Sequence, residues 1–565
     1  MDRKPAGRFW KNGVMLMAGA ALLSKLIGVF QKIPLQNIAG DRVFGIYNAV
    51  YPFYQLAAVL ATAGLPTAVS LLIAERLRRG EDIGRVRGIL QAAMLLLGCT
   101  GIIVFGLTWA AADELSLLIG DRETARAIRA VSTALLFVPF VAALRGYVQG
   151  YGRMSLSAMS QLVEQLIRVG VMVFVLWLSW TAGWGEADIA AGVMSGSAVG
   201  GLAALLFLAL YAWRDGNKKR IPREGGTLWR DMKRLAVVAM PAALGAIVVP
   251  AVGVVDAFTV PRLLHESGMS EAEAMSVFGV YSRAQPLVQL VVMMAGAAAA
   301  AIVPGLALAR MRGAYGQLSQ QLAVTMRAAW GIGAAACLGL VLLAEPLNVM
   351  LYADSKGTVI FMLVSVTALA GSVNAVAAPV LQSLGAVRAP ALLLLTAALF
   401  KVGFNAALVP AYGAEGAAAA GIAALGATAL LSTAAVRHAA AQAGAQIGWR
   451  MFAAGSAGSA PMSAARAART RDGVRSAAAL MLALAVMAAA LVLIERVLGA
   501  ALGSLLPPRA AAAALALTCV AVGACAFGAA ALRGGAVSAR EWRALPGGGE
   551  WAARLRRWRL IPPAR

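Results

Sequence analysis

Long apolar runs, separated by short polar segments, recur along the chain from about residue 12 to residue 533. Most runs hold about 20 residues, the length at which an α-helix crosses the hydrocarbon core of a bilayer. The runs lie at 12–35, 44–74, 88–111, 129–150, 157–179, 188–213, 235–261, 276–304, 323–344, 358–384, 389–409, 417–436, 477–495 and 510–532. The pattern predicts an all-α polytopic membrane protein with about fourteen transmembrane helices.

Composition supports this prediction, and the distribution of charge adds a topology. The 565 residues are 60% hydrophobic and 13% charged, with a mean hydropathy of +0.76. The net charge of +24 would suit a nucleic-acid-binding protein, but lysine and arginine concentrate in alternate loops between the runs. This bias follows the positive-inside rule and predicts that both termini are cytoplasmic. No basic patch carries aromatics for base stacking, so we exclude nucleic acid as a partner.

Side chains typical of enzymes and metal sites are scarce. The four cysteines lie in apolar runs without metal-ligand spacing, and the two histidines, His265 and His438, have no partner at the spacing of a metal site or catalytic triad. Phosphate-binding, zinc-peptidase and cofactor glycine motifs are absent from the sequence. We therefore expect no catalytic residues, no metal and no cofactor, and predict a transporter rather than an enzyme.

A repeat with an offset of 233 residues relates two parts of the apolar region. It pairs Gln149, Gly152, Leu166, Arg168, Val169 and Gly170 with Gln382, Gly385, Leu399, Lys401, Val402 and Gly403. An even number of runs separates the copies, so both cross the membrane in the same direction, as in transporters built from parallel repeats. The repeat predicts two pseudo-symmetric six-helix lobes and two further C-terminal helices.

The runs and the repeat together predict the domain organisation. The expected segments are an N-terminal lobe (1–213), a cytoplasmic linker (214–234), a C-terminal lobe (235–436), a basic cytoplasmic linker (437–476), two extra helices (477–533) and a basic cytoplasmic tail (534–565). In the tail, Trp551, Leu555 and Trp558 follow helical spacing among arginines, which predicts an amphipathic helix at an anionic membrane surface. A disordered basic tail is the alternative.

Ionisable residues within the apolar runs point to function. They are Lys25, Lys32, Glu164, Arg168, Asp256, Arg283 and Lys401. A charge at the bilayer centre costs about 2.5–3.5 kcal/mol on insertion scales, so such residues usually mark a pathway or a binding site. Because most of them are cationic, they predict a water-filled path for something negatively charged.

The first two runs carry the sharpest local signal. Lys25 and Lys32 are seven residues apart and share a helix face, and Tyr47, Tyr51 and Tyr54 form a stripe on the second run. The stripe favours either helix packing or a cavity wall that hydrogen-bonds a sugar.

Glu164 and Arg168 are four residues apart with the acid first, the favourable order on a helix. They form either a salt bridge within one helix, which makes both tolerable in lipid, or a gate at the edge of a cavity.

Several motifs, in order along the chain, resemble one family. They are Ser24-Lys25-Leu26-Ile27-Gly28, the tyrosine-rich second run with Gly64-Leu65-Pro66-x-Ala68-Val69-Ser70, Ser160-Gln161-x-x-Glu164-Gln165-x-x-Arg168-Val169, and Asp256 with Arg262-Leu263. Over about residues 8–440 the chain resembles the polysaccharide-flippase branch of the multidrug/oligosaccharidyl-lipid/polysaccharide (MOP) exporter superfamily. Within that branch it resembles the stage V sporulation protein B and MurJ-like lipid II flippases.

This resemblance implies an alternating-access flippase of the bacterial plasma membrane. Its two lobes would rock around a cationic cavity that holds the pyrophosphate and sugar of an undecaprenyl-linked cell-wall or polysaccharide precursor, with the prenyl tail near the last two runs. Lys25 matches a basic cavity residue of the family, Lys32 is a shifted candidate for a second, and Arg283 is added for its depth alone. Tyr47 and Tyr51 complete the expected substrate cavity.

The resemblance also bears on ion coupling. Asp256 resembles a carboxylate with which some relatives bind sodium, together with residues of the eleventh run, where this chain has Lys401 and, one turn later, Asn405. A lysine in place of the cation implies that Asp256 pairs with Lys401 and that sodium dependence is lost or altered. A proton-coupled role for Asp256 is the alternative.

Three other functions fit the sequence less well than a flippase does. A cation-coupled multidrug exporter of the same superfamily is disfavoured by the number of runs and the cationic interior. A membrane glycosyltransferase or polymerase would need a large loop, and a structural scaffold would not need charges within the membrane. The expected partners are a polyprenyl-linked oligosaccharide and the bilayer, and the protein itself is expected to be monomeric.

Overall fold

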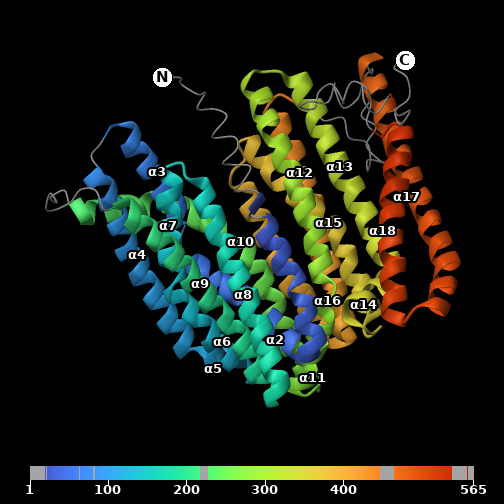
Figure 1. The fold of residues 1–565 in the computed structure, drawn as a ribbon. Helices are drawn as coiled ribbons and strands as arrows, with labels where there is room; N and C mark the ends of the chain where they lie inside the picture. Colours follow the sequence, from blue (N-terminus) through green and yellow to red (C-terminus); the bar gives the residue numbers. More distant parts are fainter. Residues whose placement is uncertain are drawn as a thin grey trace. The chain divides into compact units, whose positions relative to one another are not determined.

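The computed structural model describes residues 19–20, 22–62, 64–80, 83–216, 227–445, 464–536 and 557, and all regular structure in these ranges is helical. Figure 1 shows the elements: α2 (Lys32–Thr62), α3 (Leu65–Arg78), α4 (Ile83–Ala110), α5 (Ala112–Ile119), α6 (Thr124–Ser132), η1 (Thr133–Leu136), α7 (Val138–Gly150), α8 (Met154–Ala182), α9 (Glu186–Gly216), α10 (Thr227–Glu266), α11 (Glu271–Ser282), α12 (Gln285–Met311), α13 (Tyr315–Leu342), α14 (Ala344–Tyr352), α15 (Thr358–Ser383), α16 (Ala389–Gln442), α17 (Ala464–Leu505) and α18 (Pro508–Arg533). Residues 22–30 are helical as well. The all-α prediction is confirmed, whereas the predicted tail helix and the central parts of both linkers lie outside the described residues.

Eleven helical segments in the described part of the chain are long and apolar enough to cross a membrane. Two of them, Leu22–Arg78 and Ala389–Gln442, have 57 and 54 residues, which is more than twice the length of about 20 residues that one crossing needs. In addition, α10 is a helix of 40 residues. The number of about fourteen crossings stays a prediction.

Both long segments fold back on themselves at a glycine. In the first, Gly40 has φ 83° and ψ 177°, and Lys32 Nζ donates to Asn48 Oδ1 at 2.8 Å although the two residues are 16 positions apart. A straight helix would separate them by about 24 Å, so the chain must reverse near Gly40. In the second, Gly413 has a φ of 58°, an angle that glycine adopts without steric cost.

The sequence repeat is also visible in the structure, in the turns that end two equivalent helices. Gly152 and Gly385 both follow a helix with a positive φ, 76° and 84°. The N–H of Gly152 donates to the carbonyl of Gln149 at 2.8 Å, and the N–H of Gly385 donates to that of Gln382 at 3.0 Å. A residue in the left-handed conformation closes a helix in this way, so the two motifs are also equivalent in structure.

The same offset relates further elements. Gly120 closes α5 with a φ of 96°, and Ala353, 233 positions later, closes α14 with a φ of 64°. Correspondingly, α4 is followed by the short α5 as α13 is followed by the short α14. The prediction of two pseudo-symmetric halves is confirmed, since both the turns and the order of elements recur.

Contacts group the described residues into two compact units. Unit 1 comprises Met1–Ser282 with Asn405–Ala414, and unit 2 comprises Arg283–Phe404 with Glu415–Arg565. Helices α10 and α11 pack against α2 within unit 1, although the repeat assigns them to the second half of the chain. The lobe boundaries predicted from the repeat stay predictions.

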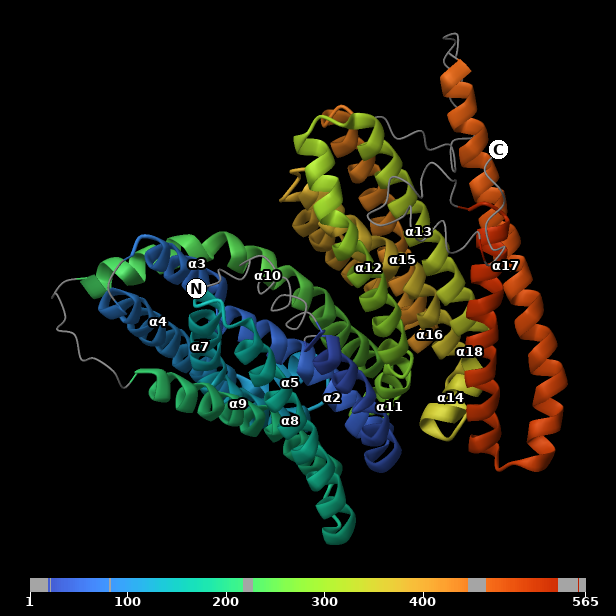
Figure 2. The same ribbon diagram turned by 45° about the horizontal axis from the view of Figure 1, so that its top comes forward.

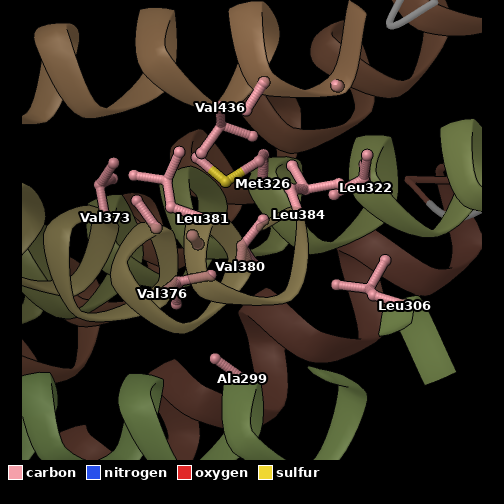
Figure 3. Close-up of a cluster of buried hydrophobic side chains, with 14 of the residues drawn as sticks. Ala299, Leu306, Leu322, Met326, Val373, Val376, Val380, Leu381, Leu384 and Val436 are labelled. Carbon is pink, nitrogen blue, oxygen red and sulfur yellow. The ribbon is translucent and has the colours of Figure 1, made fainter. Parts of the chain in front are cut away.

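Each unit has an apolar core. In unit 2 it lies among α12, α13, α15 and α16, where Figure 3 shows Ala299, Met326, Val380 and Val436 converging from the four helices. In unit 1 a core joins α3, α4, α7 and the start of α10. Alanine is frequent in both clusters. In a membrane the hydrophobic effect does not drive helices together, so small residues that allow close packing stabilise their association.

Ion pairs gather at the two ends of unit 1. At one end, Arg42 beside the Gly40 turn contacts Asp121, Glu123 and Glu186, which lie before α6 and at the start of α9. At the other end, Asp231 on α10 accepts from Arg76 at the end of α3. Loops that were expected to share a side of the membrane thus do share an end of the unit. Which end is cytoplasmic stays a prediction.

The two extra helices, α17 and α18, form a hairpin within unit 2 (Figure 2). Arg509, at the start of α18, donates from Nε to the carbonyl of Met350 at 3.1 Å and from Nη2 to that of Leu351 at 3.2 Å. These bonds satisfy carbonyls in the last turn of α14 and attach the hairpin to the unit.

Candidate functional site

A polar network in unit 1 begins at Lys32, the first residue of α2. The Lys32 ammonium is 2.8 Å from Asn48 Oδ1 and 5.9 Å from the centroid of the Tyr47 ring. Next to it, Gln31 Nε2 donates to the Tyr47 hydroxyl at 2.8 Å. The reversal of the chain at Gly40 is what brings these residues of the two arms together.

The network continues to Arg168 on α8. Gln165 Nε2 donates to Gln31 Oε1 at 3.3 Å, and Arg168 Nη1 donates to Gln165 Oε1 at 3.4 Å and to the Tyr51 hydroxyl at 3.1 Å. Hydrogen bonds therefore connect Arg168 to Gln31 and Tyr47, and Lys32 adjoins this network through the Tyr47 ring.

Glu164 lies between two arginines. Its Oε1 accepts from Arg168 Nη2 at 2.7 Å on the same helix, and its Oε2 accepts from Arg145 Nη2 on α7 at 2.8 Å. Arg145 Nε also donates to Ser160 Oγ at 2.9 Å. The salt bridge of Glu164 and Arg168 is present, but it is part of a group of three charges that carries a net charge of +1.

The three tyrosines of the stripe differ in how deeply they are buried. Tyr47 and Tyr54 are buried, at 4% and 5% exposure, whereas Tyr51 is half-buried. The rings of Tyr47 and Tyr51 stack with centroids 5.4 Å apart, and those of Tyr51 and Tyr54 are 5.9 Å apart. Packing thus accounts for the outer two rings, while Tyr51 both contacts Arg168 and keeps accessible surface.

Lys25 lies on the helical segment 22–30, and its side chain is exposed. The segment approaches α8 at Gly28, where an added Cβ would be 3.4 Å from Gln165 Nε2. A turn at Gln31 separates this segment from α2. Its role in substrate binding stays a prediction.

Arg283 has contacts that its position within an apolar run did not predict. It lies in the turn between α11 and α12 with 1% exposure. Its Nη2 donates to Asp354 Oδ2 at 3.1 Å, its Nη1 donates to the carbonyl of Lys356 at 3.3 Å, and its guanidinium lies 5.2 Å from the Tyr352 ring. These contacts tie the buried arginine to the loop before α15. The role of Arg283 as a substrate-binding cation stays a prediction.

Asp256 on α10 lies in a second polar cluster of unit 1. Its Oδ2 accepts from the Tyr281 hydroxyl at 3.0 Å and its Oδ1 accepts from Asn405 Nδ2 at 3.2 Å. Asn405 Nδ2 is also 2.7 Å from Thr259 Oγ1. The expected association of Asp256 with Asn405 is present, whereas its pairing with Lys401, which belongs to unit 2, stays a prediction.

Sequence reasoning missed Arg145, and a spacing could have found it. Arg145 and Gln149 are four residues apart on α7, and each contacts a serine of α8, Ser160 and Ser157. Gln149 was already part of the repeat motif, so the same helix face, one turn earlier, was the place to look. Gln31 and Asn48 carry no charge and gave no comparable signal.

Comparison with known proteins assigns a family to this arrangement. A family model for polysaccharide biosynthesis proteins matches residues 9–311, more than half of the chain. The chain belongs to this family. The match includes every residue of both polar clusters except Asn405, since these residues lie between Gln31 and Tyr281.

Three curated relatives come from Bacillus subtilis (strain 168). An uncharacterized membrane protein, YabM, is 30% identical over 414 residues, which cover 73% of this chain and 76% of the relative. Lipid II flippase MurJ is 26% identical over 433 residues, covering 72% and 78%. Stage V sporulation protein B is 28% identical over 198 residues, covering 35% and 38%.

Solved structures share the fold. A lipid II flippase MurJ in an inward closed conformation aligns with a TM-score of 0.61 at 13% identity, covering 91% of this chain and 97% of that one. A multidrug resistance MATE family transporter of the MOP superfamily, in an inward-facing conformation, aligns with a TM-score of 0.59 at 16% identity, covering 74% and 95%. The predicted family is confirmed, and the fold is shared with the MurJ and MATE structures. The protein is a multi-pass plasma-membrane protein, and its named relatives are transporters rather than enzymes.

Proposed function

We propose that the protein is an alternating-access flippase that moves an undecaprenyl-pyrophosphate-linked cell-wall or polysaccharide precursor across the bacterial plasma membrane. Two relatives bear the names lipid II flippase MurJ and stage V sporulation protein B, which supports a lipid-linked substrate for this chain.

The observation that carries the proposal is the network from Lys32 to Arg168. A glycan diphosphate cannot enter hydrocarbon, because its charges and hydroxyls would lose their hydrogen-bond partners. The network supplies an ammonium and a guanidinium, which bind phosphate oxygens through charge-assisted hydrogen bonds. It also supplies the half-buried Tyr51, whose ring and hydroxyl suit a sugar.

Within this proposal Lys25 and Lys32 contact the diphosphate, and Tyr47 and Tyr51 form the wall beside them. Lys25 is exposed and Lys32 is half-buried, so neither side chain is fully enclosed in the core of the unit. Several cations on one diphosphate bind it better than one, since its charge is spread over many oxygens.

A multidrug exporter is the second candidate, since MATE transporters share the fold. Exporters of cationic drugs need carboxylates that face the drug, whereas the described polar network contains one carboxylate, Glu164, already engaged by two arginines. Expression in a drug-sensitive host separates the two functions. The flippase proposal predicts unchanged drug resistance, and raised resistance to several cationic drugs would favour the exporter.

A direct test uses purified protein in vesicles that contain a fluorescent undecaprenyl-pyrophosphate-linked sugar. A quencher that cannot cross the membrane reports how fast the probe moves between leaflets. We expect wild type to accelerate this movement over protein-free vesicles, and Lys32→Gln to slow it by about tenfold or more, which corresponds to about 1.4 kcal/mol. Equal rates with and without wild-type protein would reject the proposed function.

A further inference from the structure

We propose that Arg145 and Arg168 form a binding site for the diphosphate of the substrate, and that Glu164 occupies this site as an internal anion until the substrate displaces it. The inference rests on the proposed function and adds to it. It assigns a substrate-binding role to Arg145 and a role in specificity to Glu164.

The geometry shows one carboxylate shared by guanidinium groups of two helices. Each oxygen of Glu164 takes one Nη2 group, from Arg168 at 2.7 Å and from Arg145 at 2.8 Å. Two guanidinium groups turned toward one anion match the way in which arginines clamp phosphates. A diphosphate offers more oxygens and more charge than a carboxylate, so it can compete for both.

Arg168 also has a donor that the protein leaves unused. Its Nε has no hydrogen-bond partner in the structure, and water cannot supply one because the residue is only 9% exposed and the Nε atom is buried. Buried polar groups are nearly always paired, so an unpaired one needs an explanation. A phosphate oxygen that approaches the Nε and Nη2 edge of Arg168 would supply the missing acceptor.

Helix α9 packs closely beside this cluster. A Cβ on Gly200 would lie 2.6 Å from the Glu164 carbonyl and 3.4 Å from the Arg168 Cβ, and a Cβ on Gly196 would lie 2.9 Å from the Arg168 carbonyl. The side chains of Glu164 and Arg168 extend from α8 to Arg145 on α7 and Tyr51 on α2. The cluster is thereby continuous with the network that contains Lys32.

A purely structural clamp between α7 and α8 is the competing explanation, and the two differ in sign. If Glu164 competes with the substrate, its neutralisation should strengthen anion binding. If Glu164 only positions the arginines, neutralisation should weaken anion binding, because the guanidinium groups lose their alignment.

The test measures binding of inorganic pyrophosphate to the purified full-length protein by calorimetry. We expect Glu164→Gln to bind pyrophosphate about tenfold more tightly than wild type, and Arg145→Gln and Arg168→Gln to bind it about tenfold more weakly. Glu186→Gln is the matched control, since Glu186 also accepts from an arginine, Arg42, but outside the network; its affinity should equal that of wild type.

The outcomes separate this inference from the proposed function. Unchanged or weaker binding by Glu164→Gln, or absence of binding by wild type and Glu164→Gln alike, would overturn the inference, whatever the flipping assay shows. Tighter binding by Glu164→Gln without flipping by wild type would keep the anion site and reject the flippase. If Glu164→Gln does not fold, Glu164→Ala, which also removes the internal anion, should give the same direction of change.

Discussion

Arg283 and Asp354 form an ion pair in which one partner is buried and the other is half-exposed, with side-chain exposures of 1% and 47%. Partial burial alone would raise the pKa of Asp354, but the hydrogen bonds and charge of Arg283, together with the N–H and charge of Lys356, outweigh burial and hold this pKa below its ordinary value. A carboxyl group whose pKa is lowered by folding stabilises the fold above its unfolded pKa of about 3.9. That stabilisation disappears as the pH falls through the folded pKa.

We therefore expect Asp354→Asn to destabilise the protein at pH 7 by about 1–3 kcal/mol, because the buried guanidinium of Arg283 loses its carboxylate. The difference from wild type should shrink as the pH falls below the unfolded pKa of about 3.9 toward the lower folded pKa. It should vanish only once Asp354 is protonated in both states. Thermal unfolding in detergent between pH 3 and pH 7 measures both effects. Asp113→Asn, in the exposed pair with Arg129, is the control, and an equal loss there would contradict the assignment.

The apolar runs were readable in the sequence because the bilayer imposes their length and composition. A helix must be about 20 residues long to cross, whatever its neighbours. The setting of Arg283 was not readable, because its partners lie at 348–356, beyond α12 and α13. For Arg145, the spacing from Gln149 was readable, but its contacts with Glu164 and Ser160 were not, because those residues belong to another helix.

Among the elements of unit 1, α2 and α11 approach each other closely at two glycines. A Cβ on Gly279 would lie 1.9 Å from the carbonyl oxygen of Asp41, and a Cβ on Gly45 would lie 2.2 Å from that of Met275. Small residues at a helix–helix contact allow this proximity and the dispersion contacts that accompany it. The two glycines thus determine how α11 packs on the arm of α2 that carries the tyrosines.

Gly279→Ala should separate α11 from α2 and destabilise the protein by about 1–3 kcal/mol, the usual cost of overpacking. Gly170→Ala on α8, where no atom lies within 4 Å of the added Cβ, should have little effect. Thermal unfolding of both variants in detergent measures the contrast. A Gly279→Ala protein as stable as Gly170→Ala would show that the helices are not in this contact.

The internal repeat could be predicted from the sequence, whereas the packing of α10 and α11 against α2 could not. The turns at Gly152 and Gly385 recur because each needs a glycine with a positive φ, and such a requirement is visible as a sequence motif. The association of α10 and α11 with α2 depends on close contacts such as Gly45 with Gly279. Isolated glycines in a chain with 60 of them gave no signal for these contacts.

For the whole molecule, the charge of the substrate suggests the driving force. A diphosphate head group that moves outward follows an inside-negative potential, which contributes about 2.3 kcal/mol per charge per 100 mV. We expect transport to stop when an ionophore dissipates the potential and to continue when sodium is replaced by potassium at constant potential. Flipping in vesicles with an imposed potential measures both. A strict sodium requirement would contradict this account and favour a cation site at Asp256 and Asn405.

The central claim, that the protein flips a lipid-linked cell-wall precursor through a cationic path, is tested most directly in cells. The host's own lipid II flippase is depleted, this protein is expressed, and an externally added toxin that cleaves lipid II reports whether the head group has reached the outer face. We predict that wild type restores cleavage and that Lys25→Ala, present in the membrane at the same level, does not. No restoration by wild-type protein would contradict lipid II as its substrate, and full restoration by Lys25→Ala would contradict the part assigned to this cation.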